Sequence, residues 1–418
     1  MFNYASYCKR FGFIVIFILL IISSSSKQFA YATNEDELKS ELNENIESIL
    51  DKNDFSVLDS DVNVVPDINL SFKDFVKSVL NSEQNFEYNS LFDDVKSILF
   101  KQIKNNLRFF ITLFILVILF EIFKSFSNSK YVELNFSLKI IFSFLISTTV
   151  LLFIKSFFAE ISNLVDDLFS FAGLLFPILI SLLSFSGASK SAMVFSSFSA
   201  FLLQTGSYII KFVLLPLSLS ILFLSLFGSV FSKGNFSKLT SLFKQIFKYI
   251  FVGFFAVFGL ISTVNIISTS SHDGINLKLT KFALKNYIPV LGGYVSEGFD
   301  FIYSCSVLIK NAVGVCSIII IIFKILSPLI VVIVFSLGFK VLSVVTGLVG
   351  EKCFSDMFDD VSNAFSNFLS IILGLFLICF VFIFLVIMSV SVVWSGWTGC
   401  LYNFIEYSFW VFAYSLSF

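Results

Sequence analysis

The chain is short of charged residues and of histidine, and each shortage excludes classes of protein. Asp, Glu, Lys and Arg make up 14% of the 418 residues, against about 25% in soluble domains. The single histidine, His272, cannot supply an HExxH motif or a site with two histidine ligands. The glycine-rich phosphate loops and the GxSxG motif are absent from the sequence as well. We therefore expect a protein that is not an enzyme and that has no catalytic residue, metal or cofactor.

The six cysteines exclude little and indicate little. They form no CxxC pair, and with one histidine in the chain no Cys/His zinc pattern exists. Cys305 and Cys316 are spaced to share a helix face. Small apolar packing is the expected role, because free cysteine usually packs as a small hydrophobic residue.

Apolar residues are what the chain has in abundance: 57% of it is hydrophobic and 59 residues are Phe. This composition predicts an all-α, polytopic helical membrane protein. We expect about nine transmembrane helices within 107–393, at about 107–123, 140–158, 171–187, 190–206, 208–231, 250–267, 301–323, 328–349 and 368–393. The aromatic tail 394–418 is either interfacial or an extra span, since Trp and Tyr favour the membrane interface.

The amino end has the parts of an export signal. Lys9 and Arg10 precede the apolar run Phe11–Ile22, and Ala30-Tyr31-Ala32 supplies a small-x-small exit. We predict a signal peptide over 1–32; an uncleaved anchor is the alternative. The run is shorter than the about 20 residues that span a bilayer. Export of this end would place the segment 33–106 outside the cytoplasm.

Segment 33–106 is acidic and predicts a small extracytoplasmic helical head. Apolar residues recur there at three- and four-residue steps, as in Phe72, Phe75 and Val76. Ser71 and Asp74 resemble a capping box with Asp in place of Glu. The head could be a helical bundle or an arm that docks a partner.

Lysines and carboxylates near the spans make a second set of candidates. A basic stretch with an apolar face predicts a helix on the inner leaflet, carrying Lys233, Lys238, Lys244 and Lys248. Paired carboxylates precede three spans at the outer surface: Asp93 and Asp94, Asp166 and Asp167, and Asp359 and Asp360. Asp suits the start of a helix because the macrodipole favours negative charge there. A ring of carboxylates at the mouth of an oligomeric pore is the alternative.

Charges inside spans are costly and often functional. Lys155, Lys211, Lys324 and Lys340 can reach an interface from a span end. Lys310 and Asn311 differ, since they lie about ten residues into a span. They form either a loop-edge pair or a buried polar pair that faces a bundle interior.

The stretch Ser271–Gly314 resembles the stage III sporulation protein AE family of endospore-forming bacteria. The residues that carry the resemblance include Asp273, Gly274, Asn286, Ile288, Pro289, Val290, Gly292, Lys310, Asn311 and Gly314. The layout of signal, polar head and polytopic body is also similar to that family. The tail from Trp394 departs from the expected pattern.

The resemblance implies a non-enzymatic membrane component of a secretion or feeding channel between mother cell and forespore, needed for late forespore gene expression. Its implied partners are other stage III sporulation A-operon membrane proteins and, across the intermembrane space, a forespore membrane protein, with no nucleic acid. The implied location is the mother-cell membrane around the forespore. The residues themselves leave a stand-alone secondary transporter or ion channel as the alternative, with Lys310 or Asn311 lining its path.

Overall fold

The computed structural model describes residues 54–65, 70–80, 88–126, 132–228, 238–262, 292–349 and 352–389, with positions 46, 48, 50 and 282. The elements below all belong to the unit Lys52–Phe418. Several predictions lie outside the described residues: the signal peptide 1–32, Lys233, the motif residues from Asp273 to Val290, and the tail 394–418. The side chains of Asp93, Asp94 and Gly292 lie outside them too.

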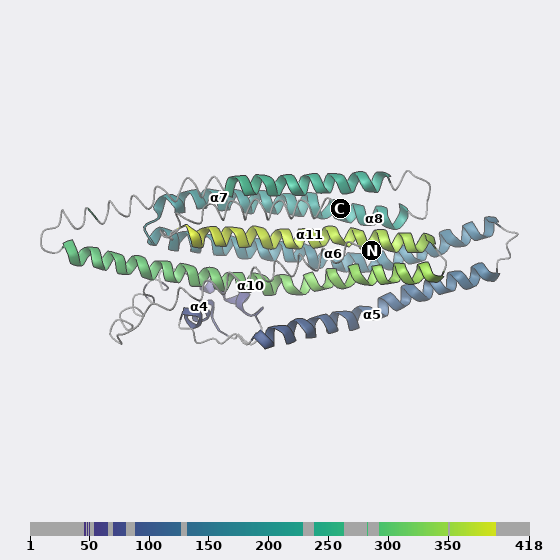
Figure 1. Ribbon diagram of the computed structural model, residues 1–418, viewed down its shortest axis with the longest axis horizontal. Coiled ribbons are helices and arrows are strands. Elements are labelled where there is room, and N and C mark those ends of the chain that lie inside the picture. The colour runs from purple at the N-terminus through teal and green to yellow at the C-terminus, as the bar shows by residue number, and fades with distance from the viewer. Residues whose placement is uncertain are drawn as a thin grey trace. The chain divides into compact units, whose positions relative to one another are not determined.

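Every described element is a helix. The long ones follow in the order α5 (Tyr88–Phe126), α6 (Val132–Phe185), α7 (Ser189–Tyr208), the π-helix η3 (Ile209–Leu214), α8 (Leu215–Gly228), the helix Lys238–Ser262, α10 (Gly292–Val349) and α11 (Lys352–Met388). Figure 1 shows α10 and α11 side by side along much of their length. Six helices of the described residues, with α7, η3 and α8 continuous as one, are long and apolar enough to cross a membrane. The protein is therefore all-helical and of the membrane class.

The helices are much longer than one bilayer requires. α6 has 54 residues and α10 has 58, so at about 1.5 Å per residue they are about 81 and 87 Å long. The hydrocarbon core of a bilayer is about 30 Å thick. Pro177 and Pro328 both lie inside these helices and end neither.

The nine separate spans are not confirmed. In three predicted pairs, one continuous helix runs from the first span into the second: 140–158 into 171–185, 190–206 into 208–228, and 301–323 into 328–349. In α7–α8, the break predicted near Gly206 is replaced by a change of helix type, because η3 takes over from α7 without a turn. A chain reversal does occur at Gly187, whose φ of 73° is one that glycine adopts readily.

Stacked phenylalanines fill the interior where four helices meet. Phe153 of α6 stacks on Phe335 of α10 with ring centroids 3.9 Å apart, and Phe109 of α5 lies 5.0 Å from Phe153. Phe365 of α11 lies 5.9 Å from Phe335 and 5.1 Å from Phe157. The abundance of Phe is thus used in ring-to-ring packing, which adds to the free energy of apolar burial.

The described part of the head includes three short helices, η2 (Ser56–Leu58), α3 (Asp59–Val62) and α4 (Phe72–Leu80). Phe55 and Phe72 stack at 5.7 Å, and both are buried. The predicted capping box is confirmed in its first half, since the Asp74 amide donates to Ser71 Oγ at 3.2 Å. The Asp74 carboxylate accepts from the Ser71 hydroxyl at 2.7 Å, in place of the backbone N–H of a full capping box.

Candidate functional site

Several polar contacts between helices of the described residues join the antiparallel pair α10–α11. Ser336 and Ser362 each lie 13 residues from Val349, and Ser343 and Ser355 each lie six residues from it. Both pairs are in contact, so the two helices fold back on each other in one register. The chain connecting them is only two residues long, which sets that register.

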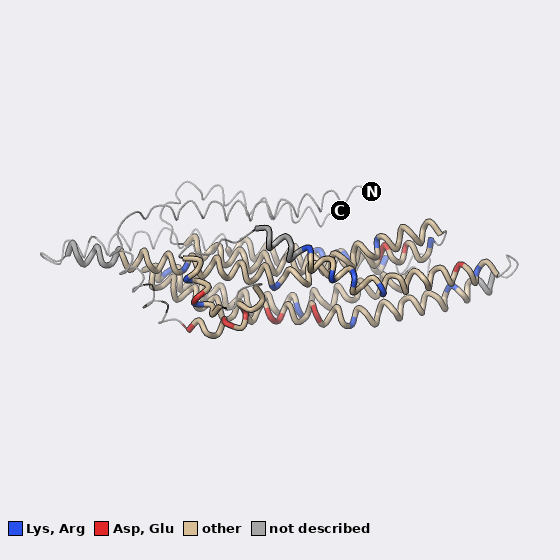
Figure 2. Tube along the Cα trace, turned by 90° about the horizontal axis from the view of Figure 1, so that it is seen from below, with Lys and Arg blue, Asp and Glu red and all other residues tan. Residues whose placement is uncertain are grey.

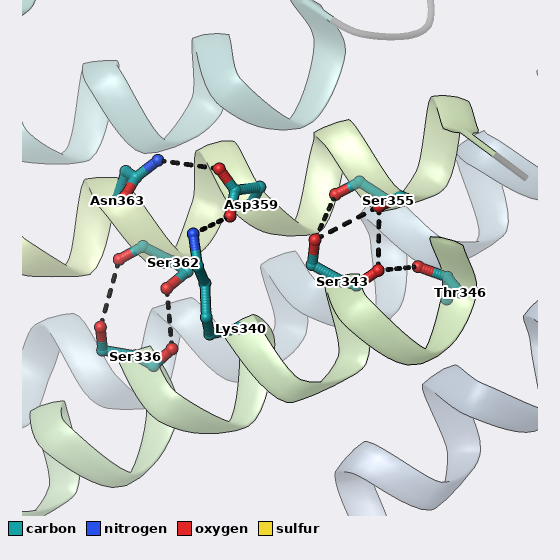
Figure 3. A network of polar contacts seen from close by, with 8 residues as sticks. All are labelled: Ser336, Lys340, Ser343, Thr346, Ser355, Asp359, Ser362 and Asn363. Carbon is teal, nitrogen blue, oxygen red and sulfur yellow. Dashed lines mark hydrogen bonds and ion pairs between the residues drawn. The ribbon is translucent and has the colours of Figure 1, made fainter. Parts of the chain in front are cut away.

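Two pairs of serines join these helices through reciprocal bonds (Figure 3). Ser362 Oγ donates to the Ser336 carbonyl at 2.8 Å, and Ser336 Oγ donates to the Ser362 carbonyl at 3.3 Å. Ser343 and Ser355 repeat the exchange at 2.9 Å in both directions. On each helix the two serines are seven residues, or about two turns, apart, so they lie on the same face of the helix. We call these four residues the serine ladder.

Between the two rungs of the serine ladder, Lys340 pairs with Asp359 (Figure 3). Asn363 Nδ2 donates to the other carboxylate oxygen of Asp359 at 3.3 Å. The side chains of Lys340 and Asp359 are 36% and 39% exposed, so this ion pair lies at the surface of the hairpin. It neutralises two charges that would be costly at membrane depth.

Lys310 closes the other end of the hairpin. Its side chain is fully buried, and its ammonium Nζ donates to the carbonyls of Val386 and Ile387 at 3.0 and 2.9 Å. These carbonyls belong to the last turn of α11, where backbone acceptors lack partners within the helix. A cation is also favoured there by the helix macrodipole. Lys310 is therefore a cap for α11 supplied by α10, which matches the predicted buried polar position.

The neighbouring motif residues fit the same contact. A Cβ added at Gly314 would lie 2.5 Å from Cδ1 and 2.8 Å from Cγ1 of Ile387, so a larger residue here would require the Ile387 side chain to move. Asn311 Oδ1 is buried and has no hydrogen-bond partner among the described residues. The structure thus places Lys310 and Gly314 at one crossing of α10 and α11.

Lys211 lies in the π-helix η3 and pairs with Asp166 of α6. Its Nζ is 2.6 and 2.7 Å from the two carboxylate oxygens. Close by, Gly206 of α7 faces Phe169 of α6, whose Cζ would lie 3.3 Å from an added Cβ. The π-helix inserts extra chain per turn, a feature often found at functional positions, and here it accompanies an ion pair between two helices.

Lys324 joins the head to the membrane helices. Its Nζ lies 2.6 Å from Asp61 Oδ1, with only 11% and 15% of the two side chains exposed. The same ammonium lies 5.7 Å from the ring centroid of Phe171 on α6. The head is thus attached at mid-length of α10 by a largely buried ion pair. Figure 2 shows lysines and acids along the helices as well as near their ends.

Fewer of the span lysines are free to extend to a membrane interface than the sequence predicted. Lys211, Lys324 and Lys340 each pair with a carboxylate, while Lys155 is exposed on α6. Of the carboxylate pairs, Asp166 and Asp359 bind lysines within the chain, Asp167 is exposed and Asp360 is partly exposed. Their role as an outer ring stays a prediction.

The basic stretch from Lys238 is part of one helix, Lys238–Ser262, that also contains residues 250–262 of the predicted span. Lys238 is exposed, whereas Lys244 and Lys248 are partly exposed. Phe247, Phe251, Phe255 and Phe258 form its buried face. Phe258 stacks near Phe198 of α7 at 5.9 Å. Contact of its lysines with the inner leaflet stays a prediction.

Sequence reasoning missed the serine ladder. The signal was present as serines spaced by seven residues on both sides of a short connection, but it is visible only once 328–349 and 352–388 are known to pair. In the part of the chain that the structure describes, no group of three or more His, Cys, Asp or Glu side chains could hold a metal ion. What this arrangement can do is fix helices against one another by internal charge pairing.

Comparison with known proteins gives two matches. The family model described as stage III sporulation protein AE matches residues 70–390, which include α4 and every longer helix described above. The stage III sporulation protein AE of Bacillus subtilis (strain 168) is 26% identical over 328 residues, covering 75% of this chain and 81% of that protein. No solved structure matches the chain.

Proposed function

Because the chain belongs to the stage III sporulation protein AE family, we propose that it is a multi-pass membrane component of a sporulation channel complex. In this proposal the complex links mother cell and forespore, and it is needed for late gene expression in the forespore. The family is a sporulation membrane component and not a known enzyme family. The match over residues 70–390 is the observation that carries the proposal.

The described geometry supports a scaffold that works without chemistry of its own. Lys211, Lys324 and Lys340 are paired within the chain, and Lys310 caps α11. Such internal pairing removes charge from membrane depth and fixes helix positions. A rigid, largely apolar body with a polar head suits a component that neighbours assemble around.

We propose as partners the other stage III sporulation A-operon membrane proteins and a forespore membrane protein across the intermembrane space. The location that follows is the mother-cell membrane surrounding the forespore. The segment from Asp273 to Gly293 contains Pro289, which favours a turn, and ends in the adjacent glycines Gly292 and Gly293, which begin α10 and add little bulk. Together with the acidic head, it is the surface we expect these partners to contact.

The experiment is purification of a tagged chain from sporulating cells, followed by identification of what remains bound. We expect the operon-encoded membrane proteins to co-purify, and a Pro289→Ala/Gly292→Leu variant to lose them while still reaching the membrane. Deletion should block sporulation after engulfment. A deletion strain that sporulates normally but fails to take up a solute would refute the proposal.

The alternative of a stand-alone transporter has less support from the geometry. Lys310, the intramembrane cation most suggestive of a substrate path, is fully buried and bound to backbone carbonyls. The role of Lys310 in joining α10 to α11 explains its buried position without a substrate. Solute transport by the purified chain in liposomes would favour the alternative.

A further inference from the structure

The amino-terminal part of α5 carries four cations that the contacts above leave unexplained. Lys96, Lys101, Lys104 and Arg108 are all exposed. The described part of the chain offers none of them an ion pair, although it pairs Lys211, Lys324 and Lys340.

Three of these cations lie in line with an apolar stripe on the same helix. Lys101, Lys104 and Arg108 follow the three- and four-residue steps that continue through Ile111 and Ile115. Leu107, Ile111, Ile115, Leu119 and Ile122 are between 39% and 51% exposed. One exposed face of α5 therefore changes from cationic to apolar at Arg108.

The apolar part of that face has the length of a bilayer core. From Leu107 to Phe126 it covers about 28 Å at about 1.5 Å per residue, close to the about 30 Å of hydrocarbon. Only 17% of the most apolar window of α5 is buried inside the protein. This stripe consequently faces lipid tails, and the cations at its end lie where phospholipid headgroups begin.

We infer that Lys101, Lys104 and Arg108, the cationic face of α5, bind the phosphate groups of anionic phospholipids in the leaflet at the amino-terminal end of this helix. The occupant is a lipid because the cations continue a lipid-facing stripe instead of lining a groove. The guanidinium of Arg108 can hold a phosphate through two parallel hydrogen bonds, and the two ammonium groups add point charges. Lys96, one turn further from the stripe, adds to the local positive charge.

The usual distribution of lysines around membrane spans does not explain the cationic face of α5. Lysines usually gather at the cytoplasmic ends of spans, whereas the export signal would place this end of α5 outside. Binding to anionic headgroups would offset the cost of cations on that side. It would also fix the depth of α5 in the bilayer and so the depth of the head that precedes it.

The test is binding of phosphatidylglycerol to the purified full chain in neutral detergent, followed by native mass spectrometry at increasing lipid concentration. The K101Q/K104Q/R108Q variant should bind the first phosphatidylglycerol at least about tenfold more weakly, since each cation near an anionic surface strengthens binding about fivefold. The wild-type preference over phosphatidylcholine should fall as salt is raised.

The control variant K155Q/K190Q/K352Q removes the same charge from exposed positions on three other helices, and it should bind like wild type. A charge-retaining K101R/K104R/R108K variant should also bind, which separates loss of charge from loss of fold. Equal binding by wild type and K101Q/K104Q/R108Q would overturn the inference. Binding of soluble polyglutamate without a preference for phosphatidylglycerol would also overturn the inference. That result would identify an acidic protein segment as the partner of this face.

Discussion

α5 and α11 are both apolar enough to cross a membrane, yet they are packed in opposite ways. The most apolar window of α11 is 56% buried inside the protein, and that of α5 is 17% buried. α11 contacts α10 through the serine ladder, α6 through Phe365 and the helix Lys238–Ser262 through Gly374. α5 presents a continuous exposed stripe from Leu107 to Ile122.

This difference shows that the hydropathy of a membrane helix does not tell whether the helix is packed inside the protein or faces lipid. Lipid tails are as apolar as a protein interior, so the same residue types serve both surroundings. What separates them is packing: glycines and hydroxyl groups at close contacts in α11, and bulky aliphatic side chains facing outward in α5. The following changes test that contrast, from the largest expected effect to the smallest.

Replacement of Phe382 in α11 should give the largest loss. Phe382 is fully buried and stacks on Phe176 at 3.8 Å, so Phe382→Ala leaves a cavity and should cost about 3–5 kcal/mol of unfolding free energy. Phe100→Ala in α5, where the side chain is 64% exposed, should change it by under about 0.5 kcal/mol. Unfolding in mixed micelles measures both, and similar losses would mean that the contrast between α5 and α11 is wrong.

Removal of the Lys310 ammonium should come next. Lys310→Met removes one donor from each of the Val386 and Ile387 carbonyls. Val386 keeps a hydrogen bond from Ser389 Oγ at 2.8 Å, so the main loss is at Ile387, at about 1–3 kcal/mol for a buried acceptor. We expect a loss of about 1–3 kcal/mol of unfolding free energy, offset in part because a buried charge is also removed. Protease cleavage near the end of α11 should become faster. The matched variant Lys155→Met changes an exposed lysine and should leave both measurements unaltered.

Glycine positions give a third test with an internal control. A Cβ at Gly374 would lie 2.8 Å from Phe255 Cζ and 3.1 Å from Phe251 Cζ, whereas at Gly173 nothing lies within 4 Å. Gly374→Ala should therefore destabilise by about 1–3 kcal/mol through overpacking. Gly173→Ala should stabilise by up to about 1 kcal/mol, because alanine is the better helix former. Stabilisation by both changes would contradict the close approach at Gly374.

The serine ladder should give the smallest effect. Hydrogen bonds between membrane helices are worth about 0.6 kcal/mol on average, so Ser336→Ala and Ser362→Ala should each cost about that amount. Because the two serines bond reciprocally, the double variant should lose less than the sum of the single losses. A double-mutant cycle measures this coupling, and strict additivity would show that the rung contributes nothing specific.

Much of the helical architecture could be predicted from sequence, while the number and ends of the spans could not. Apolar runs identified the long helices of the described residues, and residue spacing identified the contact of Ser71 with Asp74 at the start of α4. The breaks expected near Gly206 and before Pro328 did not end a helix. Proline and small polar residues are tolerated in membrane helices when neighbouring groups compensate, and a single sequence does not reveal those neighbours.

The candidate site could also be predicted from sequence only in part. The sequence marked Lys310 and Asn311 as unusual because they lie inside an apolar span. It could not indicate that Lys310 binds the carbonyls of residues 76 and 77 positions further along the chain. The pairing of Lys324 with Asp61 was hidden for the same reason, since snorkelling to an interface explains an isolated lysine equally well.

The sequence by itself determined that this protein is helical and belongs in a membrane, because its long apolar runs can satisfy their backbone hydrogen bonds within a helix while their side chains face lipid or protein. It also determined the family, through residues 70–390. Only the tertiary structure decided which helix faces lipid, where each buried lysine finds its partner, and that α10 and α11 pair in one register. Those outcomes depend on contacts between distant segments, and local patterns of apolar residues are the same whether a helix packs against protein or lipid.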